Sequence, residues 1–406
     1  MFRFIGKRIR DGFLVLLGVL SLVFFIFSLS SSDPSRMLGG QRGDEQTLAN
    51  IRAELLLDHS TLYRFGAYLN QVSPISVHTT SPGFSWKWDY NGWRFINTEC
   101  WSVALKVPFL GKSFQTKQSV NQIIAESFFE TAVLAFLSIL LALIGGVVLA
   151  VWKLAKPKAL FPKLMGVLSI GGMAFPSFFM AMLIAFLGAY LWFHEIPLFY
   201  PILVLPLFVL WKQEWGALDL FLIGCLAALV MGSILPQGGW MLVLPGTGLA
   251  FFGSLVEIDP FQGEVWAVRN LWLPLITLAI RPLSVFFQLS ESSILEEQNK
   301  PYFLTALSKG LSENRALVKH ALPNALNPIL TTAMGWLASL LAGAVFIEFI
   351  FGWKGLGLEI FEALEREDQP VIVGLVLFFS TIFIGINIIV DILYMTLDPR
   401  VKASLK

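Results

Sequence analysis

The stretch EEQNKPYFLTALSKGLSENRALVKHALPNALNP, residues 296–328, is a long polar interruption between the apolar runs 272–295 and 328–350. Its pattern predicts two short helices, about 302–309 and 312–319. A polar run of this kind does not stay in hydrocarbon, whereas its apolar flanks are long enough to cross it. We therefore expect a knob of short helices at one membrane surface, between two segments that span the bilayer.

The knob has a predicted turn and a basic surface. Gly310 separates the two short helices, and Ser312 can cap the second one, although Arg315 does not complete a capping box. Lys309, Arg315 and Lys319 alternate with apolar residues. This spacing leaves two interpretations open: a docking surface for a soluble partner, or a loop whose basic residues meet anionic lipid headgroups.

Composition places the whole chain in lipid. Of 406 residues, 56% are hydrophobic and 14% are charged, and the mean hydropathy is +0.70. A helix needs roughly 20 apolar residues to cross the bilayer. Six runs qualify: 12–30, 127–151, 165–193, 272–295, 328–350 and 370–396. Two weaker runs, 196–211 and 217–236, form a candidate extra hairpin. The predicted fold is an all-α membrane protein with six core spans, or eight with the hairpin.

Several functional classes are excluded by composition and motifs. A net charge of +1 argues against a nucleic-acid binder. Cys100 and Cys225 lie far apart, and their surroundings fit neither a disulfide framework nor a zinc site. Gly111-Lys112-Ser113 resembles the end of a P-loop, but Lys106 stands where the first glycine is required. We expect no metal, no cofactor and no ATP hydrolysis in this chain.

The distribution of Lys and Arg predicts the orientation. Basic residues gather at the N-terminus, in the loop after the second span and in the C-terminal tail, whereas residues 351–369 are mainly acidic. Cytoplasmic loops carry the positive excess. Both termini are therefore predicted to be cytosolic, and an extra two-legged hairpin leaves that parity unchanged.

Two segments are predicted to lie in water on the outer face, 31–125 and 237–271. Within the first, 45–72 has helical periodicity and 73–100 is irregular or strand-like. The expected common face of that helix carries Leu48, Ile51, Leu55, Leu62, Phe65 and Leu69.

The predicted organisation has three parts. Residues 1–30 are a basic segment and the first span, 31–125 are an extracytoplasmic domain, and 126–401 are the membrane domain. The membrane domain contains the candidate hairpin at 196–236, the outer loop at 237–271 and the cytosolic loop at 296–327.

Polar residues inside spans are costly in lipid and are candidate functional positions. Arg281 lies mid-span and either lines a solute path or pairs structurally. Glu348 lies near the outer end of its span, as a gate contact or an interface pair. Asn387 and Asp391 share one helix face, for which helix packing is the main alternative to a pathway role.

From about Leu273 to Val401 the chain resembles the inner-membrane permease family of dipeptide, oligopeptide and nickel ABC importers. The landmarks, in order, are Leu273-Pro274, Ser292 to Glu296, Tyr302, Thr305-Ala306, Lys309 to Ser312, His320 to Leu322, Asn324-Ala325, Pro328, Leu340 to Ala344, Glu348, Gly355 to Gly357, Asp368, Pro370, Asn387, Asp391 and Asp398-Pro399-Arg400. The opening FRFIGKRI and Asp33-Pro34 resemble the same family.

The resemblance implies a type I importer permease in the bacterial inner membrane. It implies four kinds of partner: a second homologous permease subunit, two ABC ATPase domains that hold ATP and Mg, an extracytoplasmic solute-binding protein, and the lipid bilayer. Nucleic acid is not among them. In this family the Lys-Gly-Leu-Ser block belongs to the loop that rests on the ATPase. The contact residues implied here are Tyr302, Thr305, Ala306, Lys309, Gly310, Leu311 and Ser312.

The chain also departs from the family pattern. Gln288, Glu291 and Leu307 stand where arginine is usual, and Lys354 stands for proline. Residues 73–107 and 195–240 look like additions.

The alternative function is an ATP-independent secondary transporter or channel. It predicts several membrane-buried acids or related halves in the hydropathy profile, and we find neither in the sequence. The cargo, whether oligopeptide, dipeptide, nickel chelate or another solute, and the direction of transport stay open.

Overall fold

The computed structural model describes residues 2–29, 35, 45–79, 92–97, 101–158, 160–186, 253–259 and 263–397. The candidate hairpin at 196–236 lies outside these residues. The chain divides into two compact units: Met1–Ser127 with Glu359–Ile384, and Phe128–Leu358 with Gly385–Lys406.

Among the described residues, four helices are long and apolar enough to cross a membrane, and each matches a predicted span. Gly6–Ser28 lies within α1 (Phe2–Leu29), and Gln369–Ile392 lies within α16 (Gln369–Leu397). The other two are α5 (Val120–Ala155) and α10 (Trp272–Gln298). These four predicted spans correspond to continuous helices.

The remaining two predicted spans correspond to bent helix pairs. Leu164–Ala174 of α6 (Leu160–Ala174) and α7 (Ser177–Ala185) meet at 117°. Glu313–Leu341, which ends within α13 (Leu322–Gly343), meets α14 (Val345–Phe351) at 55°. Pro176 lies at the first bend, where it forces a break because it has no backbone donor. The described part of the chain thus holds four candidate spans, or up to six if each bent pair is one span.

The first unit contains α1, the part of α16 up to Ile384, and the region between α1 and α5. The predicted helix 45–72 is two helices, α3 (Glu45–Glu54) and α4 (Thr61–Val72). Ser60 caps α4 by accepting a hydrogen bond from the Tyr63 backbone N–H at 3.4 Å, which favours a new helix start there. Phe65 and Leu69 pack against α1. Leu62 is 74% exposed, so the single common face predicted for this segment is wrong at that residue.

A sheet follows α4, so the fold as a whole is not all-α. Strands β1 (Ile75–Thr79), β3 (Trp101–Lys106) and β2 (Gly92–Asn97) form an antiparallel sheet in the order β1-β3-β2. The strand-like character predicted for 73–100 is thereby confirmed for its described strands. Alternating β-branched and aromatic residues fit a pleated, half-buried surface better than a helix.

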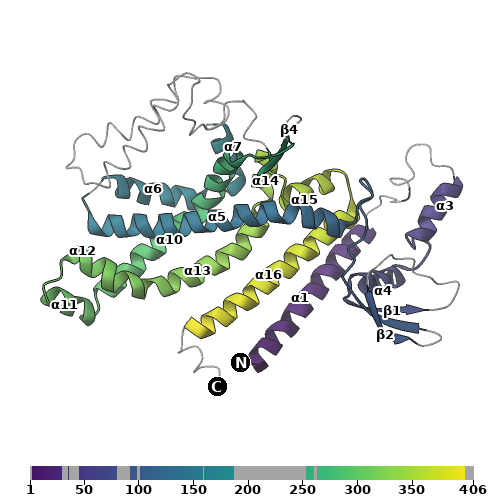
Figure 1. The fold of residues 1–406 in the computed structure, drawn as a ribbon, viewed down its shortest axis with the longest axis horizontal. Coiled ribbons are helices and arrows are strands. Elements are labelled where there is room, and N and C mark those ends of the chain that lie inside the picture. The colour runs from purple at the N-terminus through teal and green to yellow at the C-terminus, as the bar shows by residue number, and fades with distance from the viewer. Residues whose placement is uncertain are drawn as a thin grey trace. The chain divides into compact units, whose positions relative to one another are not determined.

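The second unit is built around α10, whose buried residues extend from Leu273 to Ile294. It packs against α6, α7 and α13 (Figure 1). A short hairpin of β4 (Val256–Asp259) and β5 (Gly263–Trp266) precedes it, followed by the 3₁₀ turn η2 (Val268–Leu271). After α14 the chain continues into α15 (Leu356–Glu365).

Candidate functional site

The polar knob predicted at 302–319 is a set of short helices at the common end of α10 and α13 (Figure 1). It consists of α11 (Pro301–Ser308), α12 (Glu313–Ala316) and the π-helical turn η3 (Leu317–Ala321), which runs directly into α13. We call residues 301–321 the knob. Gly310 turns the chain between α11 and α12 at φ +87°, a conformation that glycine adopts without strain. The predicted helix–turn–helix is confirmed.

The knob has a hydrophobic core of its own. Its buried members are Ile294, Phe303, Ala306, Ala316, Leu317, Ala321 and Ala325. Val151 and Leu154 at the end of α5 pack against the same cluster. Burying one side chain the size of Phe303 contributes about 1.5–3 kcal/mol. The knob is therefore fixed to the ends of α5, α10 and α13 by packing, and it is not a loose loop.

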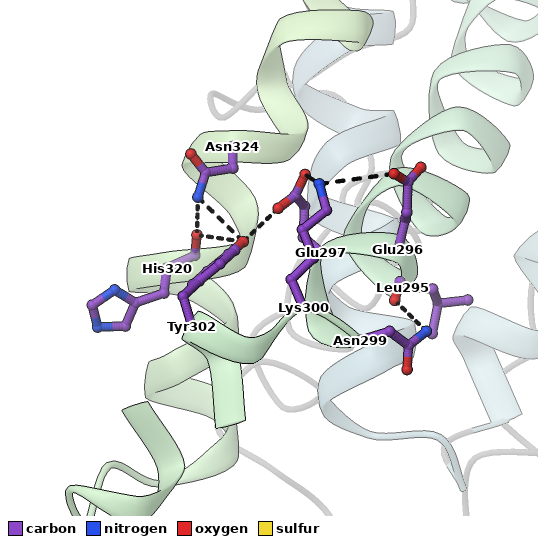
Figure 2. A network of polar contacts seen from close by, with 8 residues as sticks. All are labelled: Leu295, Glu296, Glu297, Asn299, Lys300, Tyr302, His320 and Asn324. Carbon is purple, nitrogen blue, oxygen red and sulfur yellow. Dashed lines mark hydrogen bonds and ion pairs between the residues drawn. The ribbon is translucent and has the colours of Figure 1, made fainter. Parts of the chain in front are cut away.

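A polar network also fastens the knob (Figure 2). The Tyr302 hydroxyl donates to Glu297 Oε2 at 2.5 Å, and Lys300 Nζ lies 2.6 Å from Glu297 Oε1. Asn324 Nδ2 donates to the Tyr302 hydroxyl oxygen at 3.2 Å and to the His320 carbonyl at 3.0 Å. Burial and the hydrogen bond to Glu297 raise the pKa of Tyr302. Because these groups come from α10, α11 and α13, the network joins all three elements.

The residues assigned to the partner contact divide into two sets. Thr305, Lys309, Gly310 and Ser312 are exposed, and the Tyr302 ring is 36% exposed. Ala306 and Leu311, by contrast, belong to or pack against the core of the knob. Ala306 is buried and Leu311 is half-buried, so these two members of the implied set face the core of the knob more than its surface. The partner contact itself stays a prediction.

Two apolar residues on the exposed face were missing from the implied contact set. Leu304 is 58% exposed and Val318 is 52% exposed. They accompany the exposed basic residues Lys309, Arg315 and Lys319. Helical periodicity could have found Leu304, because Phe303 and Ala306 mark the buried face of α11 and Leu304 falls opposite. The exposed residues of the knob thus include two large apolar side chains and three cations, against one exposed acid, Glu313. We call this exposed part of the knob its outer face.

Glu348 is fully buried and holds a loop closed. Its Oε1 accepts from Thr131 Oγ1 at 2.8 Å, and its Oε2 accepts from the backbone N–H groups of Gly357 at 2.6 Å and Leu358 at 3.3 Å. Thr131 Oγ1 in turn accepts from the Leu356 N–H at 2.8 Å. A Cβ at Gly357 would lie 2.5 Å from Val345 Cα, so only glycine fits. These hydrogen bonds hold the loop after α14 against α5 and α14.

A second buried acid, Glu130, lies one residue before Thr131. The Leu255 backbone N–H donates to its two carboxylate oxygens at 3.2 and 3.1 Å, and Trp353 Nε1 donates to its backbone carbonyl at 3.1 Å. No local sequence pattern indicates these pairings, because the partners lie more than 100 residues apart. Both buried acids are therefore engaged by fixed donors, which is the arrangement expected of structural carboxylates.

Arg281 lines a small cavity of about 60 Å³ at the bends of both helix pairs. Phe175 and Ser177 line it from the α6–α7 bend, and Ile347 lines it from α14. Within the described residues Arg281 forms no ion pair with Glu348, although the cavity reaches both of their helices. Asn387 and Asp391 are half-buried and one turn apart on α16.

Glu291, one of the departures from the family pattern, has a partner in this chain. Lys153 Nζ at the end of α5 lies 2.7 Å from Glu291 Oε1. Lys153 also lies 5.3 Å from the centroid of the Phe287 ring. A cation on α5 thus compensates the carboxylate on α10 locally.

Comparison with known proteins places the chain in a family. Residues 138–403 match the family described as the binding-protein-dependent transport system inner membrane component, and residues 1–84 match the corresponding N-terminal family. The chain belongs to this permease family. It is the permease component of an ABC importer, a multi-pass membrane protein and a transport subunit rather than an enzyme.

Individual relatives match over most of their length. The chain is 30% identical to the dipeptide transport system permease protein DppB of Haemophilus influenzae, over 72% of this chain and 76% of that protein. It is 28% identical to the di/tripeptide permease DppB of Pseudomonas aeruginosa, over 99% of both chains. It is 26% identical to the dipeptide permease DppB of Alkalihalophilus pseudofirmus, over 96% of both. Since the Pseudomonas protein is matched end to end, segments 73–107 and 195–240 do not make this permease longer than that relative.

Proposed function

We propose that this permease forms one half of a pathway for importing short peptides. Its partners would be a second homologous permease subunit, two ATPase domains that bind ATP and Mg, and an extracytoplasmic binding protein that delivers the cargo. The names of the dipeptide and di/tripeptide relatives support the cargo class. Both termini lie in the cytosol in this proposal, on the side of the knob.

One observation carries the proposal: the knob is firmly held on its inner side and offers a mixed apolar and basic face on the other. The inner side is secured by its core and by the Tyr302–Glu297 network. The outer face carries Leu304, Val318 and three exposed cations. A partner that binds this face can move α10 and α13 together with the knob, because the packing described above makes the knob and the ends of these helices one rigid body.

The proposed movement leads from the knob to the bend between α13 and α14. ATP binding would draw the two ATPase domains together and shift the knob, which is continuous with α13. Further along, α13 meets α14 at the 55° bend. Both helices line the cavity that Arg281 of α10 also lines. Such a two-state displacement would open the pathway alternately to each side. In this mechanism the chain binds and moves but performs no covalent chemistry.

The test uses the outer face of the knob. Leu304→Asp and Val318→Asp should release the ATPase from the purified complex and lower peptide uptake, because an apolar anchor contributes about 1–2 kcal/mol or more to an interface, roughly a tenfold change in affinity. Leu364→Asp is the matched control, since Leu364 is 55% exposed on α15. Uptake and ATPase retention unchanged in both knob variants would refute the proposed contact.

A further inference from the structure

The first unit contains a cavity that the transport mechanism does not use. It has a volume of about 460 Å³ and lies among α1, α3, α4, the segment 110–117 and the start of α16. One part of its wall is apolar and aromatic, with Phe24, Phe27 and Val373. Another part is cationic, with Arg64, Lys112 and Lys117. An apolar wall beside a group of positive charges suits a ligand that is itself amphipathic.

The cavity lies where two spans reach the membrane surface. Phe27 and Ser28 belong to the last turn of the span Gly6–Ser28, and Gln369 and Pro370 begin the span Gln369–Ile392. Both helix ends line the same cavity. Span ends lie at the depth of the lipid headgroups, where acyl chains and phosphates meet.

The three cations form no ion pair within the described residues. Arg64, Lys112 and Lys117 form no side-chain hydrogen bond there either. Burial lowers the pKa of Arg64, a consequence of a partly dehydrated guanidinium group. The Asp368 carboxylate accepts from Ser113 Oγ at 2.5 Å and from the Phe114 N–H at 3.1 Å, and it pairs with none of the three cations. An anionic ligand would offset the excess of positive charge that lines the cavity.

An aromatic side chain adds to the apolar part of the wall. Tyr68 lines the cavity and stacks on Phe24 at 5.7 Å between ring centroids. The two rings give acyl chains a flat apolar surface to pack against.

We propose that this cavity binds an anionic phospholipid. The phosphate lies among Arg64, Lys112 and Lys117, and the acyl chains lie against Phe24, Phe27 and Val373. The inference does not rest on the proposed function or on the orientation of the chain, because it depends only on the ends of two spans and the side chains between them. A lipid headgroup and free phosphate would bind the same cations. The apolar wall distinguishes them, because only a lipid has acyl chains to pack against it.

The experiment is native mass spectrometry of the delipidated importer complex, titrated with phosphatidylglycerol, phosphatidylcholine or inorganic phosphate. We expect phosphatidylglycerol to bind at least tenfold more tightly than phosphatidylcholine. The triple variant Arg64→Ala, Lys112→Ala, Lys117→Ala should lose that preference. The charge-matched control replaces Lys7, Lys158 and Lys354, which do not line the cavity, and should keep it.

A second variant tests the apolar part. Ala67→Trp fills the cavity without changing its charge, since Ala67 is a half-buried lining residue, and it should reduce phosphatidylglycerol binding at least tenfold. Three results would overturn the proposal: equal binding of the two lipids, equal loss in the charge-matched control, or full competition by inorganic phosphate at the same concentration as the lipid. Recovery of each variant in the assembled complex shows that it has folded.

Discussion

Among single residues, Gly310 is the position where substitutions can test the requirement for folding and the requirement for partner contact separately. Its φ of +87° makes any other residue strained, at a cost of about 1–2 kcal/mol. An added Cβ would nevertheless meet nothing within 4 Å in this chain. Gly310→Ala should therefore insert normally and retain most of its peptide uptake. Gly310→Trp should also insert but lose uptake and transport-coupled ATPase activity, because the indole would occupy the surface that a partner needs.

The pair of variants gives the prediction its control. Membrane yield measures insertion, and uptake of a labelled dipeptide measures function in the same cells. If the tryptophan variant transported as fast as the alanine variant, Gly310 would lie outside the contact. If both failed to insert, the turn itself would be the requirement.

At the scale of elements, Glu348 is predicted to stabilise the loop after α14 and not to carry ions. Glu348→Ala leaves the hydroxyl of Thr131 and the N–H groups of Gly357 and Leu358 without an acceptor. Each buried unsatisfied group costs about 1–3 kcal/mol. We expect the apparent Tm in detergent to fall by roughly 5 °C or more.

The control for that prediction is Glu362→Ala. Glu362 forms an exposed pair with Arg366, and such pairs contribute about 0–1 kcal/mol, so its Tm should barely change. Glu348→Gln adds a functional measurement. A Gln variant with unaltered Tm but no uptake would favour the gate or ion-coupling role over the fastening described here.

Some of these elements could be predicted from the sequence and others could not. Long apolar runs predicted the positions of the four continuous helices, because hydrocarbon thickness sets the length of a span. The other two predicted spans fall on the bent pairs, and their bends were not predicted. The knob followed from a local polar pattern and a glycine. Glu348, in contrast, meets Thr131 across 217 residues of sequence, and no local pattern encodes such a contact. Helical periodicity is enough to predict that Ala306 faces inward. The family motif covers the block as a whole and does not distinguish its inward from its outward residues.

At the scale of the whole molecule, the order of the spans sets which surface each segment faces. In the proposed orientation α1 starts in the cytosol and six spans cross the membrane, which would return the knob between α10 and α13 to the cytosol and leave α15 outside. The basic N-terminus and the acidic 351–369 segment agree with that orientation. An extra hairpin of two crossings before α10 would leave both positions unchanged.

Two single-cysteine reporters test this orientation in cells. With Cys100 and Cys225 replaced by serine, Lys309→Cys should react with a membrane-impermeant maleimide only in inside-out vesicles, since Lys309 is exposed on the knob. Leu364→Cys should react only in intact spheroplasts. The two positions differ by one crossing of the bent pair α13–α14, so opposite labelling also shows that this pair spans the membrane. Labelling of Lys309→Cys from outside would move the knob away from any cytosolic ATPase, and the coupling mechanism would fail with it.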